Sequence, residues 1–217
     1  MQKFKKAFYL IKKIDKKIAV KALACATVLA ITFTFCDFSA KCDSIRENVL
    51  RLHILANSDS ENDQALKLKV RDAVLNVSDE VFFGCNNEAD AVKAAEKMSG
   101  FITEVAQNEV YKNGYSYEVR VEIADTWFER RTYDDFTLPA GNYEALRIII
   151  AEGKGHNWWC VMFPAVCIPA VTERNQISDV LTNDETEIVS KPQKYVARFK
   201  VVEFFQKTSR KLFSFFN

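Results

Sequence analysis

Histidine is scarce in this sequence of 217 residues, which contains His53 and His156 and no others. A nucleophilic cysteine that needs a histidine as its base has therefore little choice of partner. The sequence also lacks a Cys-x-x-Cys pair, so a zinc site built on His156, Cys160 and Cys167 would still need a fourth ligand. We expect neither a metal nor a cofactor.

A phosphate-binding loop is missing as well. Gly153-Lys154-Gly155 follows an apolar stretch, but the second glycine, lysine and serine or threonine of the full motif do not accompany it. Residues 22–190 contain 15 basic and 27 acidic residues, and an acidic body is a poor match for phosphates. We therefore expect no nucleic acid partner and no small-molecule substrate.

The positive charge is concentrated at the two ends. Residues 1–21 carry eight lysines against Asp15, and residues 191–217 carry seven basic residues against Glu203. Basic segments of this kind are attracted to anionic lipid.

An apolar run, Ala22–Cys36, follows the N-terminal lysines. A basic segment before an apolar run is typical of an export signal, and the positive charge keeps the N-terminus in the cytoplasm. Residues 1–40 are therefore predicted to be a basic leader that acts as an export signal or a membrane anchor. Whether the leader is cleaved stays open, because Phe38 occupies a position near Ala40 where cleavage requires a small residue.

Residues 45–170 are predicted to form an α+β domain. Leu50, Leu52 and Ile54 alternate with polar residues, and the same alternation recurs from Tyr115 to Ile123. Residues 127–133 and 143–151 also favour strands, and two helical patterns cover residues 61–81 and 88–112. The order strand, helix, helix and three strands predicts a mostly antiparallel sheet with two helices packed on one face.

The remaining residues are expected to be a linker and a helix. Residues 171–194 are acidic without periodicity and predict a linker. Residues 195–217 have an aromatic stripe with basic residues on the other sides, which predicts an amphipathic helix. This helix either packs on the domain or lies on a membrane surface.

The cysteines leave two readings open. Cys160 and Cys167 enclose six residues that include Pro164, so they could close a short disulfide loop or remain two reduced core residues.

A recognition surface is the main hypothesis for function. Trp158 and Trp159 cannot point the same way in an extended segment, so one ring is expected to be packed and the other partly presented. Tryptophan, tyrosine and arginine are the residue types that dominate the binding energy of protein–protein contacts. The predicted partner-binding residues are Arg51, His53, Asn57, Asp59, Tyr143, Lys154, His156, Trp158 and Trp159. The alternative function is an exported thiol-dependent hydrolase that uses Cys160 with His53 or His156.

Four segments, 50–59, 67–72, 139–145 and 153–167, resemble the stage II sporulation protein R family of endospore-forming bacteria. The resemblance covers roughly residues 46–169. It implies a signalling protein that the forespore exports into the space between two membranes. It further implies activation of a membrane-embedded aspartic protease, stage II sporulation protein GA, which processes the sigma-E precursor in the mother cell. The resemblance carries over no catalytic residue, so it implies a protein that is not an enzyme.

Overall fold

The long helix α2 (Lys16–Glu47) contains the apolar run of the leader. The computed structural model describes residues 16–133, 136–164 and 177–216, and the chain divides into two units, Met1–Lys41 and Cys42–Asn217. The 32 residues of α2 rise about 48 Å, more than the roughly 30 Å of a bilayer core. Its threonine hydroxyls donate to carbonyls four residues back, as Thr27 does to Leu23, so the polar groups are satisfied within the helix. By length and composition this helix fits a signal peptide or a membrane anchor, as predicted.

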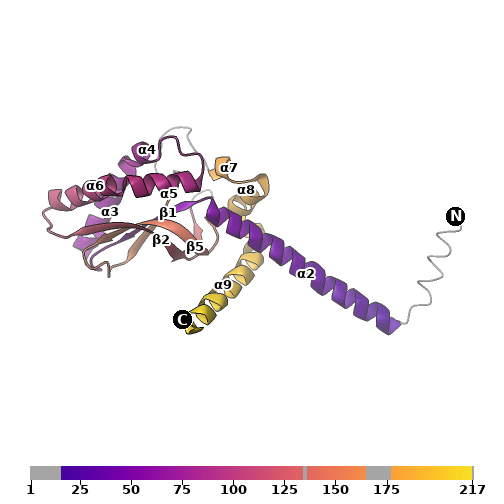
Figure 1. The fold of residues 1–217 in the computed structure, drawn as a ribbon. Coiled ribbons are helices and arrows are strands. Elements are labelled where there is room, and N and C mark those ends of the chain that lie inside the picture. Colours follow the sequence, from indigo (N-terminus) through magenta and orange to yellow (C-terminus); the bar gives the residue numbers. More distant parts are fainter. Residues whose placement is uncertain (1–15, 134–135, 165–176, 217) are drawn as a thin grey trace. The chain divides into compact units, whose positions relative to one another are not determined.

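A four-stranded sheet forms the centre of the second unit (Figure 1). The strands, in chain order, are β1 (Leu50–Leu55), β2 (Val119–Phe128), β5 (Gly141–Ile150) and β6 (Asn157–Phe163). In the sheet they are ordered β2-β5-β1-β6, with β1 parallel to β5 and the other two pairings antiparallel. A small ribbon of β3 (Arg131–Thr132) and β4 (Thr137–Leu138) lies between β2 and β5 in the chain. The α+β prediction with a mostly antiparallel sheet is confirmed.

One face of the sheet is covered by helices α3 (Glu61–Asn76), α4 (Ser78–Val81), α5 (Glu88–Lys97) and α6 (Ser99–Lys112) (Figure 1). Leu50, Leu52 and Ile54 of β1 pack here with apolar residues of the helices, such as Val70 and Ile102. Each of the two predicted helices is in fact two, because the first breaks at Val77 and the second at Met98. The predicted helical layer on one face is present.

The other face is also buried, at the end where β1 begins. Arg51, Phe128, Tyr143 and Val161 are inaccessible there. This two-sided burial explains why β6 was not predicted from the sequence: a strand covered on both faces lacks the alternation of apolar and polar residues that reveals a strand.

The C-terminal part is more ordered than the predicted linker. Residues 171–176 lie outside the described residues, but α7 (Ile177–Val180) and α8 (Asn183–Ser190) are helices. Thr182 and Glu185 form a reciprocal capping box at the start of α8, and Ile188 and Val189 are buried. A short 3-10 helix (Pro192–Tyr195) leads into α9 (Val196–Phe216), the predicted C-terminal helix.

Candidate functional site

The loop after β1 and the loop before β6 lie against each other at one end of the sheet. The amide of Gly155 donates to the carbonyl of Ala56 at 2.9 Å, and the amide of Lys154 donates to the carbonyl of Asn57 at 3.2 Å. A side chain at residue 155 would lie 2.2 Å from the carbonyl oxygen of Ser58. The two sequence segments that carry most of the predicted site are therefore in direct contact.

Buried polar groups fix the first of these loops on helix α3. The carboxylate of Asp63 accepts hydrogen bonds from Asn57 at 2.8 Å and from the hydroxyl of Ser58 at 2.5 Å. Burial alone would raise the pKa of Asp63, but these hydrogen bonds to the charged form keep the pKa below its usual value. Ser60 caps the start of α3, since its hydroxyl accepts from the amide of Asp63.

Lys67 connects helix α3 to the second loop. Its ammonium group donates to the carbonyl of His156 at 2.9 Å and to Gln64 at 2.6 Å. A lysine on an amphipathic helix is expected to face solvent, but Lys67 is 4% exposed. Its long side chain spans the space between the helix and the loop while its charge is satisfied by oxygen atoms.

The end of the sheet presents charged groups to solvent. The carboxylate of Asp59 accepts from both the backbone amide and the ring Nδ1 of His156, each at 2.5 Å, and these bonds keep the pKa of Asp59 below its ordinary value. The side chains of Lys154 and His156 are 76% and 81% exposed. Of the predicted partner-binding residues, Asn57, Asp59, Lys154 and His156 therefore lie together; we call these four the loop site.

Arg51 does not belong to that surface. Arg51 and His53 were predicted as partner contacts, but Arg51 is 0% exposed and His53 is also buried. The guanidinium donates to the carbonyl of Cys160 at 2.8 Å and to the hydroxyl of Tyr133 at 2.7 Å, and it lies 4.2 Å from the ring centre of Phe128. These partners replace part of the lost water of a buried cation, while the third nitrogen, Nη1, has no hydrogen-bond partner among the described residues.

Tyr143 is buried beside Arg51 as well, with its hydroxyl donating to the carbonyl of Pro139 at 2.6 Å. It was predicted as a partner contact, but its buried position makes it a support for the fold. The turn at Leu138 to Gly141 is held by this bond.

The two tryptophans point to opposite faces, as expected for an extended segment. Trp159 stacks on His53 with ring centres 4.0 Å apart, and Trp158 lies under the guanidinium of Arg71 at 4.4 Å. Both rings are half-buried, so neither is freely presented. Burial lowers the pKa of His53 to about 4, which keeps the stacked imidazole neutral at ordinary pH.

Cys160 and His53 are not placed to act together as the nucleophile and base of a thiol hydrolase. Cys160 is opposite Leu52 and packs in the core under the helices, whereas His53 is opposite Trp159 on the other face of the sheet. His156, the other possible base, is at the exposed loop. Cys160 carries a disulfide, and Cys167 lies outside the described residues, so their pairing stays a prediction.

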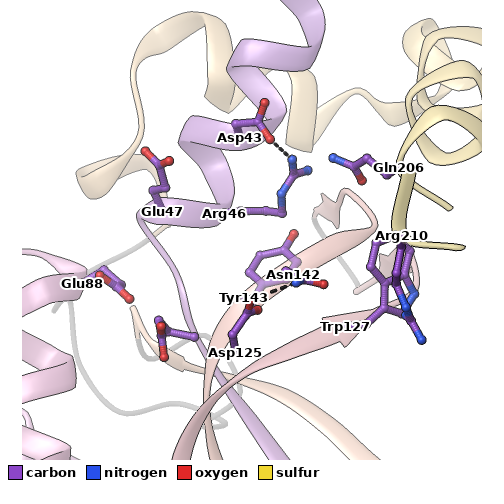
Figure 2. Close-up of a pocket in the computed structure, with 11 residues that line it drawn as sticks. Asp43, Arg46, Glu47, Glu88, Asp125, Trp127, Asn142, Tyr143, Gln206 and Arg210 are labelled. Carbon is purple, nitrogen blue, oxygen red and sulfur yellow. Dashed lines mark hydrogen bonds and ion pairs between the residues drawn. The ribbon is translucent and has the colours of Figure 1, made fainter. Parts of the chain in front are cut away.

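A pocket of about 660 Å³ lies elsewhere in the second unit and was not predicted (Figure 2). Its charged lining consists of five carboxylates and two guanidinium groups: Asp43, Glu47, Glu88, Asp125, Glu144, Arg46 and Arg210. Burial and the neighbouring Glu144 and Glu47 raise the pKa of Glu88. The lining residues come from α2, the start of α5, β2, β5 and α9. Because these elements are far apart in the sequence, no local sequence pattern reveals the pocket. Among the described residues, no group of three side chains is placed to hold a metal ion.

Comparison with known proteins identifies the family to which this chain belongs. The family model described as stage II sporulation protein R matches residues 46–173, which include the helical layer, the sheet and the loop site. The chain belongs to the stage II sporulation protein R family. A relative named Stage II sporulation protein R, from Bacillus subtilis (strain 168), is 35% identical over 123 residues. The match covers 57% of this chain and 55% of the relative, so the chain spans about half the length of that protein. No solved structure matches the chain.

The family region ends before α7, so α8 and α9 lie outside it. The loop site and the buried cluster around Arg51 lie inside it. Both are therefore features of the part that this chain shares with the stage II sporulation protein R family.

The close approach at Gly155 generates a test of the loop contact. We expect Gly155→Ala to lower the free energy of unfolding by about 1–3 kcal/mol, because the new methyl group would overlap the Ser58 carbonyl. Gly100→Ala is the matched control, since Gly100 lies in helix α6 with open space around it and alanine favours a helix by about 0.5–1 kcal/mol. Urea unfolding of both variants measures the difference, and a neutral Gly155→Ala would contradict the contact.

The buried carboxylate of Asp63 predicts a pH-dependent stability. We expect Asp63→Asn to lower the free energy of unfolding by about 1–3 kcal/mol at neutral pH, with Asp72→Asn on the exposed side of α3 as the control. The folded-state pKa of Asp63 is below the unfolded value of about 3.9. The contribution is therefore complete above about pH 4 and is lost as the pH falls through the folded-state pKa. Thermal unfolding from pH 7 downward measures it, and a constant difference between wild type and Asp63→Asn would refute this role.

Proposed function

We propose that this protein is an exported signal of sporulation that activates a membrane-embedded aspartic protease. The observation that carries the proposal is membership of the stage II sporulation protein R family over residues 46–173. The apolar helix α2 near the N-terminus supports export, with the acidic second unit placed outside the cytoplasm. The destination is the space between the forespore and mother-cell membranes, and the target is the stage II sporulation protein GA protease.

In this proposal the protein acts as a ligand and not as a catalyst. Binding to the extracytoplasmic part of the protease favours the active arrangement of the protease, by no more than the difference in affinity for its two states. A ligand of this kind needs a rigid surface, because ordering a flexible loop on binding would cost free energy. The burial of Cys160, on the opposite face of the sheet from His53, supports the absence of thiol chemistry.

The loop site is the surface we propose for docking. Its backbone is fixed by hydrogen bonds between two loops and by Lys67, while Lys154 and His156 remain exposed. Exposed side chains on a fixed backbone can contact a partner without rearrangement of the fold. The half-buried Trp158 and Trp159 then act as support beneath this surface and not as the first contact.

Processing of the sigma-E precursor tests the proposal. The full chain is produced in a heterologous bacterium together with the protease and the precursor, and cleavage is followed by immunoblot. We expect the double variant Lys154→Ser/His156→Ala to reduce cleavage about tenfold, as the loss of two contacts of about 1 kcal/mol or more would. Lys112→Ser, a similarly exposed lysine at the end of α6, should leave cleavage unchanged.

The amount of each variant outside the cytoplasm is measured in the same cells. Full cleavage by the double variant at normal export would contradict docking at the loop site. Absence of cleavage with the unmodified chain, exported at a normal level, would contradict activation itself.

A further inference from the structure

Helix α9 packs on the rest of the second unit through one of its faces. Phe199 and Val202 are buried in this contact. Beside them, Glu203 pairs with Arg130 at 3.5 Å, and Lys207 pairs with Glu129 at 2.9 Å. The face of the C-terminal helix that carries Phe199 and Val202 therefore packs on the domain.

The opposite face of α9 is mostly exposed. A helix turns 100° per residue, so Ala197, Val201, Phe204, Phe205 and Thr208 lie opposite the buried face. Phe204 and Phe205 are each 67% exposed, and their rings contact each other edge to face with centres 5.9 Å apart. In Figure 1 this helix is the yellow segment that leads to the C-terminus. Two neighbouring exposed phenylalanines on one helix face are typical of a surface that contacts another protein or a membrane.

The charges that flank these rings are positive. By the same helical geometry Lys200 lies one turn before Phe204, and Lys207 lies one turn after it. Glu203 is the one carboxylate among the described side chains of α9, and it lies on the packed face with Arg130. The outer face is thus apolar in the middle and basic along the edge that carries Lys200 and Lys207.

We propose that the outer face of α9 lies on the surface of a bilayer that contains anionic phospholipid. Phe204 and Phe205 enter the boundary between head groups and acyl chains, while the exposed Lys200 contacts the phosphates. A helix that is apolar on one face and basic at the borders favours anionic lipid over a second copy of this acidic unit. The inference does not rest on the signalling role, because helix α2 already brings the chain to a membrane as an export signal or an anchor.

Photochemical labelling of the full chain in lipid vesicles tests this contact. The vesicles are made of phosphatidylcholine with or without phosphatidylglycerol, and they contain a trace of phosphatidylcholine that carries a photoactivatable acyl chain. Trypsin cleaves after Lys200 and Lys207, so labelling of the 201–207 peptide reports on Phe204 and Phe205. Lipid contacts of α2 appear on separate peptides and are the same for every variant.

We expect strong labelling of the 201–207 peptide in vesicles with phosphatidylglycerol. Labelling should fall about tenfold without the anionic lipid, and also in the variant Phe204→Ser/Phe205→Ser. Phe83→Ser, which alters an exposed phenylalanine outside α9, is the matched control and should keep the label. Circular dichroism checks that the variants remain folded.

Two results would overturn the proposal. One is labelling that does not depend on Phe204 and Phe205 or on the anionic lipid. The other is an unlabelled 201–207 peptide together with a dimer that dissociates in the double variant on sedimentation, because this would assign the face to a second copy of the chain.

Discussion

The loop after β1 and the loop before β6 approach each other so closely that residue 155 has no room for a side chain. This contact joins the central parallel strand β1 to the edge strand β6 beyond the last pair of the ladder, Leu55 with Asn157. Lys67 then ties the second loop to helix α3. Because backbone groups of both loops are paired, the exposed side chains at this end stand on a fixed support.

The sheet below the loops is supported from both sides. Apolar helices cover one face, whereas the other face holds Arg51 among the rings of Phe128, Tyr133 and Tyr143. A buried guanidinium is costly unless its donors are satisfied, and here it binds the carbonyl of Cys160 in β6. The cation therefore fastens the edge strand to the centre of the sheet and contributes to the rigidity that a docking surface requires.

Sequence patterns predicted the helices and strands better than they predicted which side chains are buried by distant parts of the chain. Alternation from Tyr115 to Ile123 indicated a strand, which in the structure is β2 and begins at Val119. The helical stripes indicated the layer that covers one face. The same alternation placed Arg51 on the polar side of β1, but the aromatic rings that bury Arg51 come from residues about 80 positions away, which no local pattern reveals. The helix α8 had a local signal, because Thr182 and Glu185 have capping-box spacing. Residues 50–59 and 153–167 contain most of the predicted partner-binding residues and resemble one family. The contact between the two segments is seen only in the structure.

Amide hydrogen exchange of the full chain tests most directly whether the two loops form one rigid end. The amides of Lys154 and Gly155 donate to carbonyls of the first loop, and the amide of His156 donates to Asp59. We expect the free energy of opening measured for these three amides to lie within about 1–2 kcal/mol of that for the amides in β1. Exchange of the three at the rate of an unprotected loop would contradict it.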